Sequence, residues 1–203
     1  MEVLTAVTPV KKTKTIPEEL IYEIDEGMPI YYRGYRDVLS GKLKTDDIMC
    51  SSRKQSFIIT QLIFWLRPTL ETFFHFFTSE LGIKFKKSQR AADIALVLKP
   101  RMSFEDIWSN EYMTIIPDII IEVDIKADVT EMPDPTNYFF RKTQQLLNNG
   151  ATKVIWIFTA SETVMVAESG KAIWEIKSWT QDVEVSHGCT FNIAQIIAKF
   201  QGK

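Results

Sequence analysis

Alternation of apolar and charged residues between positions 117 and 126 is the clearest structural pattern in this chain. The segment reads PDIIIEVDIK. Residues two apart in a strand point to the same face, so one face here is entirely apolar. The opposite face carries the polar set Asp118, Glu122, Asp124 and Lys126, together with Ile120. The pattern predicts a strand over 118–125 that packs one face on a core and brings carboxylates and an ammonium together near its end.

Hydrophobic periodicity elsewhere predicts two long helices among several strands. Ser51 and Ser52 offer an N-cap for the first helix, and Pro68 kinks or divides that helix, which is expected to resume through Phe77. The second helix is predicted over 137–149, with Gly150 as its C-terminal cap. The predicted strands, besides 118–125, are 20–24, 29–35, 83–87, 91–98, 153–158, 163–168, 171–176 and 182–185.

This order of elements predicts an α/β fold. We expect a mixed central β-sheet flanked by helices, with an N-terminal β-hairpin extension made from the first two strands. The helix over 137–149 is expected to be a crossover between two parallel strands. The length of 203 residues suits a single domain over 16–203, preceded by a flexible N-terminal arm over 1–15.

Composition narrows the function classes. A hydrophobic content of 45%, a charged content of 25% and a net charge of −2 are typical of a soluble globular protein, not of a strongly basic nucleic-acid binder. The chain has no apolar stretch of the roughly 18–20 residues that a membrane span needs, so we expect a cytoplasmic protein without a membrane partner. With two histidines and two distant cysteines, any metal is expected to be held by oxygen ligands, which suits Mg²⁺ or Mn²⁺.

Two acids in neighbouring predicted strands are the candidates for such a site. Asp93 is the single acid in the apolar strand over 91–98, and Glu122 lies in the next strong strand. Neighbouring strands are about 4.8 Å apart, which allows both carboxylates to converge on one cation. The alternative is a strand end whose charges are solvated or paired with Lys126 and Arg141, with no chemistry attached.

These residues resemble the PD-(D/E)XK nuclease superfamily and, within it, a bacterial family of restriction endonuclease-like proteins of largely uncharacterised function. The resemblance covers roughly residues 20–200 and rests on the Asp93 strand, PDIIIEV at 117–123, KTQQLLNNG from Lys142 onward, and KVIWIF at 153–158. It implies a restriction endonuclease-like core. It also implies that Asp93 and Glu122 hold Mg²⁺ (or Mn²⁺) and that a metal-activated water hydrolyses DNA. Gln55 stands where the family places a supporting polar residue.

The position of the family's lysine is the main departure from this pattern. The lysine usually follows the acid by two positions, where this chain has Asp124, a candidate third metal ligand. Two catalytic candidates remain: Lys126, on the predicted strand, and Lys142, on the crossover helix. Helical spacing places Lys142 and Gln145 on one helix face, so Gln145 is a further supporting candidate. We favour Lys142. Asp118 lies about 13 Å along the strand from Glu122, at roughly 3.3 Å per residue, and is predicted to be a strand-entry residue.

The displaced lysine also motivates an alternative function. In that hypothesis the chain keeps the nuclease fold but cleaves weakly or not at all, and serves as a nucleic-acid-binding or assembly module. A basic group is the candidate DNA contact in either case, unless it is only a solvated strand face: Lys84, Lys86, Lys87 and Arg90. A homodimer is a further expectation, with the aromatic hairpin residues Tyr31, Tyr32 and Tyr35 forming either its surface or a flap over the core.

Overall fold

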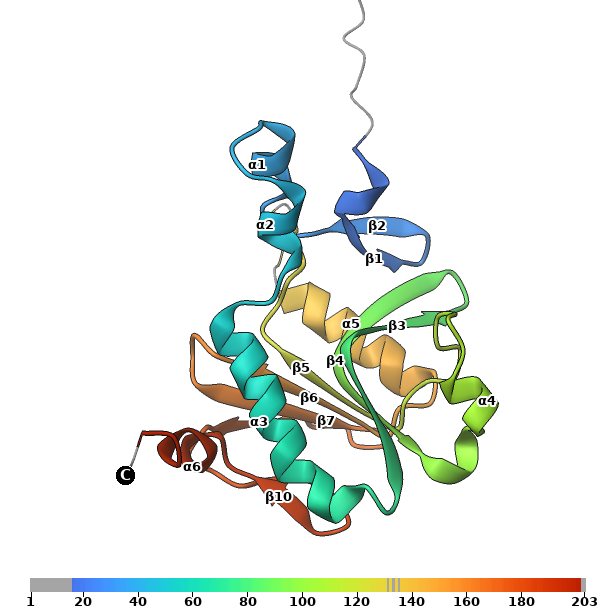
Figure 1. The fold of residues 1–203 in the computed structure, drawn as a ribbon, viewed down its shortest axis with the longest axis vertical. Coiled ribbons are helices and arrows are strands. Elements are labelled where there is room, and N and C mark those ends of the chain that lie inside the picture. The colour runs from blue at the N-terminus through green and yellow to red at the C-terminus, as the bar shows by residue number, and fades with distance from the viewer. Residues whose placement is uncertain (1–15, 131, 133, 135, 202–203) are drawn as a thin grey trace, which may run out of the picture.

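A large mixed β-sheet with helices on both faces forms the body of the protein (Figure 1). The computed structural model describes residues 16–201 apart from 131, 133 and 135. The N-terminal arm predicted over 1–15 lies outside the described residues. The prediction of an α/β fold with a mixed sheet flanked by helices is confirmed.

The strands of the large sheet follow the order β2-β1-β4-β5-β6-β7-β8, and β3 pairs with β4. The described part of the chain has one parallel pair, β5 with β6, and α5 (Thr136–Asn148) connects them as the predicted crossover. A second, two-stranded sheet pairs β9 (Val183–Ser186) with β10 (Cys189–Phe191). The bounds of the large sheet are β1 (Ile21–Asp25), β2 (Met28–Tyr31), β3 (Phe74–Phe85), β4 (Ser88–Leu98), β5 (Ile119–Val123), β6 (Lys153–Phe158), β7 (Thr163–Glu168) and β8 (Glu175–Ser178).

Two helices cover opposite faces of this sheet (Figure 1). The long helix α3 (Arg53–Leu70) packs through a stripe of leucine and isoleucine at four-residue spacing: Ile58, Leu62, Leu66 and Leu70. On the other face, α5 packs Tyr138 and Leu146 against a cluster that includes Trp156. The remaining helical elements are η1 (Glu18–Leu20), α1 (Tyr35–Leu39), α2 (Thr45–Met49), η2 (Lys99–Arg101), α4 (Phe104–Ile107) and α6 (Ile193–Ala198). None of the helices in the described ranges is long and apolar enough to cross a membrane.

The aromatic run after Pro68 is a strand, so the prediction that the first helix resumes through Phe77 is wrong. Pro68 stays inside α3, close to its end, and the helix ends at Leu70. Phe74 to Phe77 then open β3 and pair in register with Leu98 to Ala95 of β4. Aromatic side chains fit a pleated, half-buried surface well, and the long partner strand decides between the two structures.

Several predicted strands have different ends in the structure. The strand predicted over 29–35 ends at Tyr31, and helix α1 begins at Tyr35. The strand predicted over 118–125 ends at Val123, because Asp124 has a φ of 61°, a left-handed backbone that an extended strand cannot continue. The strand predicted over 171–176 is found at Glu175–Ser178.

A fork in the sheet along β4 positions the candidate site. One edge of β4 pairs with β3 along most of its length. The other edge has two partners: β1 at Gln89, and β5 from Ile94 onward. Between these partners, the edge near Ala91 and Asp93 faces side chains instead of a strand. Backbone groups in such a gap need substitutes for the missing ladder bonds.

Candidate functional site

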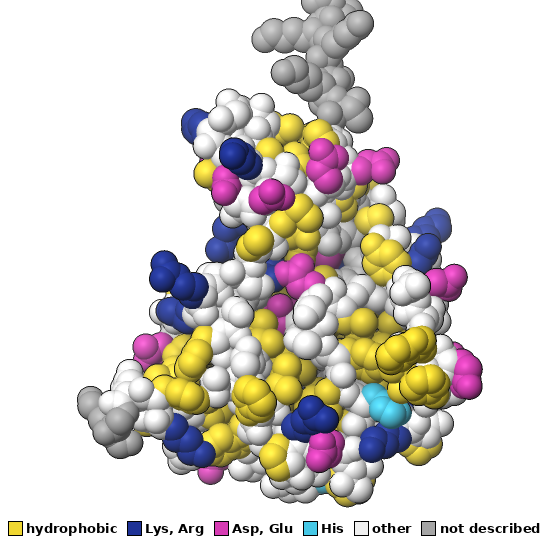
Figure 2. Space-filling view, in the orientation of Figure 1, with side chains coloured by type: hydrophobic (Ala, Val, Ile, Leu, Met, Phe, Trp, Pro, Cys, Tyr) yellow, Lys and Arg dark blue, Asp and Glu magenta, His cyan; other side chains and the backbone are white. Residues whose placement is uncertain are grey.

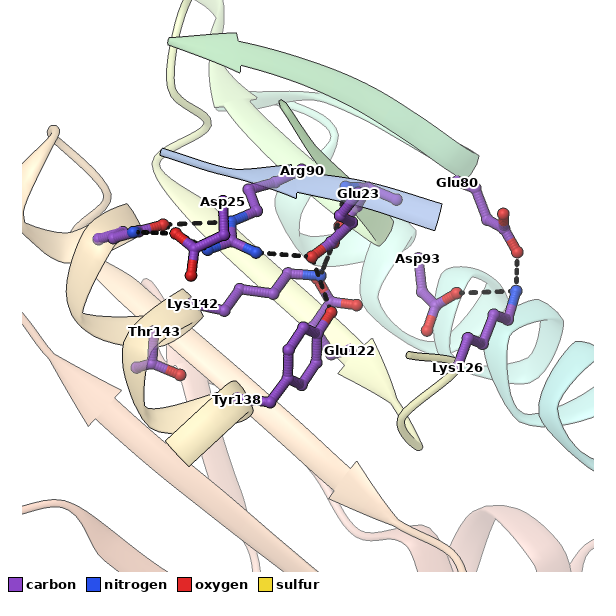
Figure 3. A network of polar contacts seen from close by, with 12 residues as sticks. Glu23, Asp25, Glu80, Arg90, Asp93, Glu122, Lys126, Tyr138, Lys142 and Thr143 are labelled. Carbon is purple, nitrogen blue, oxygen red and sulfur yellow. Dashed lines mark hydrogen bonds and ion pairs between the residues drawn. The ribbon is translucent and has the colours of Figure 1, made fainter. Parts of the chain in front are cut away.

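A buried ammonium group occupies the fork. Lys142 Nζ lies 2.7 Å from Glu23 Oε1 and 2.9 Å from Glu122 Oε1, and it donates a hydrogen bond of 2.7 Å to the Ala91 carbonyl (Figure 3). The residue is 0% exposed. Burial alone would lower the pKa of Lys142, but the carboxylates of Glu122 and Glu23 outweigh it and raise the pKa above its usual value. Lys142 is therefore held as a cation.

The packing of α5 fixes this lysine. Tyr138, Lys142 and Leu146 follow each other at four-residue intervals on the buried helix face. The next residue, Thr143, accepts a hydrogen bond of 2.8 Å from the indole nitrogen of Trp156 on β6. The helix thus has a defined rotation on the sheet, and the Lys142 side chain enters the fork between β1 and β5.

Glu23 of β1 is a site residue that the sequence analysis missed. Its carboxylate accepts hydrogen bonds from the Ala91 backbone nitrogen (3.0 Å), from the Tyr138 hydroxyl (2.8 Å) and from Arg90 (2.9 Å), besides the contact with Lys142. Burial opposes ionisation, but the charges of Lys142 and Arg90 hold the pKa of Glu23 below its usual value. The one signal in the sequence was an acid at the fourth of the five positions of the predicted strand over 20–24.

Arg90 does not belong to a solvent-facing basic rim, and that prediction is wrong for this residue. It is 2% exposed and forms ion pairs with Glu23 and Asp25, each at 2.9 Å. Gln145 accepts a hydrogen bond from Arg90 Nε (3.2 Å) and donates one of 2.6 Å to Asp25. The apolar surroundings require these charges to pair. Gln145, predicted as a supporting residue, therefore supports Arg90.

Asp93 lies on the other side of the fork. Its Oδ2 accepts the backbone N–H of Val123 at 2.8 Å, in place of a ladder bond. Gln55, near the start of α3, donates to Asp93 at 3.3 Å and to the Val123 carbonyl at 2.8 Å, so the predicted supporting position of Gln55 is where the structure places it. Burial raises the pKa of Asp93, and the bond from Val123 opposes that rise.

Lys126 approaches Asp93 from the loop after β5. Its Nζ lies 3.8 Å from Asp93 Oδ1, donates to Ser51 at 2.9 Å and forms an ion pair with Glu80 (Figure 3). Burial and the charge of Lys142 lower the pKa of Lys126 to about 8. The two candidate lysines thus bracket the two candidate acids: Lys142 contacts Glu122, and Lys126 contacts Asp93.

A β-bulge places Glu80 opposite Asp93. The pairing of β3 with β4 shifts between Thr78 and Leu81, and the two residues between them have left-handed backbones, with φ of 66° at Ser79 and 58° at Glu80. Consecutive non-glycine residues in this region are costly, and bulges of this kind re-aim side chains. Here the bulge turns Glu80 toward Lys126.

Asp124 turns away from the line of the strand. Its carboxylate accepts the backbone N–H and the hydroxyl of Thr159, each at 2.7 Å, beyond the end of β6. Asp118 stands at the opposite end of β5, where it accepts the Leu98 backbone N–H and pairs with Arg101. Within the described ranges, no group of three or more His, Cys, Asp or Glu residues is arranged to hold a metal ion. The role of Asp124 as a third ligand stays a prediction.

Glu122 has the most unusual electrostatic environment of the candidate ligands. It is 1% exposed, and its Oε1 atom lies 2.9 Å from Lys142 Nζ and accepts no further hydrogen bond within the described structure. Burial raises the pKa of Glu122 to about 8, against the lowering effect of Lys142. A buried carboxylate oxygen with spare acceptor capacity, beside a second carboxylate on Asp93, fits a divalent cation that prefers oxygen ligands.

Two cavities reach this site from outside. One, of about 240 Å³, lies between α3 and β3 and is lined by Asp93, Glu80 and hydroxyl side chains such as Thr60 and Thr78. The other, of about 570 Å³, is lined by Glu23, Arg90 and Glu80 among others. Glu80 borders both. Figure 2 shows acidic side chains in a hollow near the middle of the corresponding face.

Three of the predicted DNA contacts lie on the surface but away from the acids. Lys86 and Lys87 are exposed at the turn between β3 and β4, and Lys84 is exposed near the end of β3. Lys87 is six positions before Asp93, which corresponds to about 20 Å along an extended strand. They can contact a long ligand that also reaches Asp93, but not the same phosphate.

Comparison with solved structures identifies a neighbour of the same fold. It is a protein from Anabaena variabilis ATCC 29413 whose crystal structure is described as "a putative nuclease belonging to DUF820". The TM-score is 0.64 at 16% sequence identity, over 87% of this chain and 89% of that one. No protein-family model matches the sequence. A search of curated proteins also finds no match. The chain therefore shares the fold of this neighbour, and its activity has to be argued from its own residues.

Proposed function

We propose that this protein is a Mg²⁺-dependent nuclease of the PD-(D/E)XK type that hydrolyses DNA phosphodiester bonds. The observation that carries the proposal is the Glu122 carboxylate: it is buried, its only ion-pair partner within the described residues is Lys142, and it lies on the strand next to the one that bears Asp93. A carboxylate has about four acceptor sites and the ion pair with Lys142 occupies one of them, so Glu122 can accept a further ligand. The fold shared with a protein described as a putative nuclease supports the same proposal.

Each residue then has a distinct part in the proposed site. Asp93 and Glu122 would hold Mg²⁺ or Mn²⁺, with Asp124 as a candidate third ligand. A divalent ion in such a site supplies an activated water and neutralises charge on phosphoryl oxygens. Gln55 orients Asp93, to which it donates a hydrogen bond. Glu23 balances the charge of Lys142 and so fixes that ammonium next to Glu122.

The two lysines offer different chemistry. Lys142 contacts Glu122 but is wholly enclosed and shared with Glu23. Lys126 contacts Asp93, and its side chain is 11% exposed. Lys126 is open enough to stabilise the negative charge that develops on a phosphate, whereas Lys142, whose ammonium already contacts Glu23, Glu122 and the Ala91 carbonyl, would act by positioning Glu122. We retain Lys142 as the first candidate, because it is the lysine in contact with Glu122.

The alternative, a nuclease-fold protein that binds nucleic acid without efficient cleavage, has one observation in its favour. The carboxylate of Asp93 already accepts hydrogen bonds from Val123 and Gln55, and Glu122 already has Lys142 as an ion-pair partner. Such a network is stable without a metal ion. Binding of DNA without turnover would identify this case.

The direct test is cleavage of plasmid and single-stranded DNA with Mg²⁺ or Mn²⁺, together with calorimetric titration of Mn²⁺. We expect cleavage by the wild type and loss of both cleavage and Mn²⁺ binding in Glu122→Gln and Asp93→Asn. Glu26→Gln is a suitable control, because Glu26 is an exposed acid on the hairpin turn. Cleavage that persists unchanged in Asp93→Asn would refute the proposed site.

A further inference from the structure

The larger cavity beside the site has an aromatic wall that the proposed chemistry does not use. Three tyrosines from different segments line it: Tyr22 on β1, Tyr32 just after β2, and Tyr112 in the loop before β5. The rings of Tyr22 and Tyr32 are 5.0 Å apart at an angle of 53°. The cavity measures about 570 Å³, which is larger than the space a single nucleobase fills.

Tyr112 is held in place by backbone pairing to β3. Met113, its neighbour, donates to the Gly82 carbonyl at 2.9 Å and accepts from Lys84 at 2.8 Å. The Tyr112 ring lies directly on Gly82, where a Cβ atom would come within 2.4 Å of Cδ1 and 2.5 Å of Cε1. Glycine at this strand position lets the ring approach the backbone. Tyr112 nevertheless remains 56% exposed, so most of its surface is open to a ligand.

The polar groups of the cavity favour a base over a phosphate. Its acids are Glu18, Glu23 and Glu80, and carboxylates repel phosphate. Glu23 is already taken up by its donors, Arg90 among them, so Glu18 and Glu80 are the carboxylates that can accept hydrogen bonds from an exocyclic amino group. Glu23 and Glu80 each pair with cations, so their charge is largely compensated. Gln89 adds an amide that can donate and accept. Aromatic rings with a few polar groups are the usual means of holding a base that is not paired.

The cavity also has lining residues that contact or border the proposed catalytic site. Glu23 contacts the same ammonium as Glu122, and Glu80 borders the smaller cavity that contains Asp93. We propose that the cavity formed by Tyr22, Tyr32 and Tyr112 binds an unpaired nucleobase of a single-stranded nucleic acid whose backbone continues past Glu80 toward Asp93. The inference rests on the proposed function and specifies its substrate: a strand with unstacked bases. A base in a duplex would have to leave the stack before it could enter.

The test is binding of a short fluorescent single-stranded oligonucleotide in EDTA, measured by anisotropy, which requires no cleavage. The wild type should bind it more tightly than a blunt duplex of the same sequence. Tyr112→Leu and Gly82→Ala should each weaken binding at least about fivefold, because the first removes the stacking ring and the second displaces it. Tyr112→Phe keeps the ring and should stay within about twofold of the wild type.

Trp108→Leu is the matched control, because Trp108 is an exposed aromatic residue near in sequence that does not line the cavity. Unfolding curves of all variants should coincide, which separates binding from folding. Equal affinity for single strand and duplex, or Tyr112→Leu binding like the wild type, would overturn the inference. Failure of the wild type to bind the oligonucleotide would do the same.

The outcome is separable from that of the proposed function. Binding that depends on Tyr112 but is not followed by cleavage would support the proposed base site and refute the proposed nuclease activity. Cleavage whose rate and KM are unchanged by Tyr112→Leu would support the proposed nuclease activity and refute the proposed base site.

Discussion

The Lys142 ammonium lies 2.9 Å from the Glu122 carboxylate in the interior of the protein, although one comes from helix α5 and the other from β5, one of the two partners of β4 at the fork. Glu23 completes the group at 2.7 Å from the same ammonium. Charges buried in this way stabilise a fold only as a complete set. The first three predictions follow from this arrangement.

Glu23→Gln should destabilise the protein strongly. The change leaves Lys142 and Arg90 buried with less compensating charge, and removing one partner of a buried ion pair costs about 3–5 kcal/mol. Urea denaturation followed by tryptophan fluorescence measures the loss. The conservative control is Glu26→Gln, three positions away and exposed, which should change the free energy of unfolding by less than about 0.5 kcal/mol. Equal stability of the two variants would contradict the proposed charge balance.

Substitution of Lys142 and substitution of Lys126 should lower the rate of cleavage to different extents. Lys142→Met should abolish cleavage, because it removes the cation in contact with Glu122. Lys126→Met should reduce turnover by about 10²–10³-fold if Lys126 stabilises a developing charge. Single-turnover cleavage with Mg²⁺ and calorimetric titration of Mn²⁺ distinguish loss of chemistry from loss of metal. Full activity in Lys142→Met would show that Lys142 is not catalytic and would make Lys126 the remaining candidate.

Glu122→Gln should have a pH-dependent effect on stability. The folded-state pKa of Glu122 is raised to about 8 from an ordinary value of 4.5, mainly by burial. Between these values the folded protein binds a proton that the unfolded chain releases, so this group lowers stability as pH rises from about 4.5 toward 8. The neutral glutamine has no such pH dependence, so the stability of Glu122→Gln relative to the wild type should increase as the pH rises from about 5 to 8. A difference in melting temperature that stays constant over this range would contradict the raised pKa.

Ser79→Gly should stabilise the fold, despite its position within a strand. Ser79 has a φ of 66°, which costs L-residues energy and glycine little, so a gain of about 0.5–1 kcal/mol is expected. Lys84→Gly on the same strand is the counterpart: its backbone is ordinary, and glycine there should cost a similar amount. Chemical denaturation of both variants gives the comparison. Destabilisation of equal size in both would show that the bulge stores no strain.

The exposed lysines of the β3–β4 turn should contribute to the salt dependence of DNA binding. Replacing Lys84, Lys86 and Lys87 by alanine should reduce the slope of log K against log salt by about 1 for each lysine that contacts a phosphate. Affinity measured by anisotropy at several NaCl concentrations gives the slope. An unchanged slope would show that this turn is a solvated strand end.

Much of the fold could be predicted from local patterns. The PDIIIEV strand, the crossover helix before Gly150 and the KVIWIF strand each carry an unambiguous period, and the structure has β5, α5 and β6 in these places. The aromatic run at Phe74–Phe77 could not be assigned in the same way. Its choice of strand depends on a distant partner, β4, that no local pattern contains.

The candidate site was predictable only as far as its acids lie on strong strands. Asp93 and Glu122 stand out because they interrupt apolar runs, and Lys142 because it precedes Gly150 on an amphipathic helix. Glu23 could not be found in this way, since nothing in its own strand indicates that Arg90 and Lys142 will meet it. The same long-range pairing explains why the burial of Arg90 could not be predicted. Its neighbours in sequence are basic, so it resembled a surface residue.

The fork in the sheet also fixes the order in which the site can be completed during synthesis. Glu23 and Lys142 are separated by 119 positions, and Glu23 leaves the ribosome first. Glu23, on the hairpin of β1 and β2, can pair with Arg90 as soon as β4 is made. The carbonyl of Ala91 cannot accept its hydrogen bond from Lys142 until α5 emerges. β4 therefore carries an incomplete edge throughout the synthesis of β5 and the following loop. The ion pairs that would support chemistry in the finished protein are, for the growing chain, the contacts that close this edge.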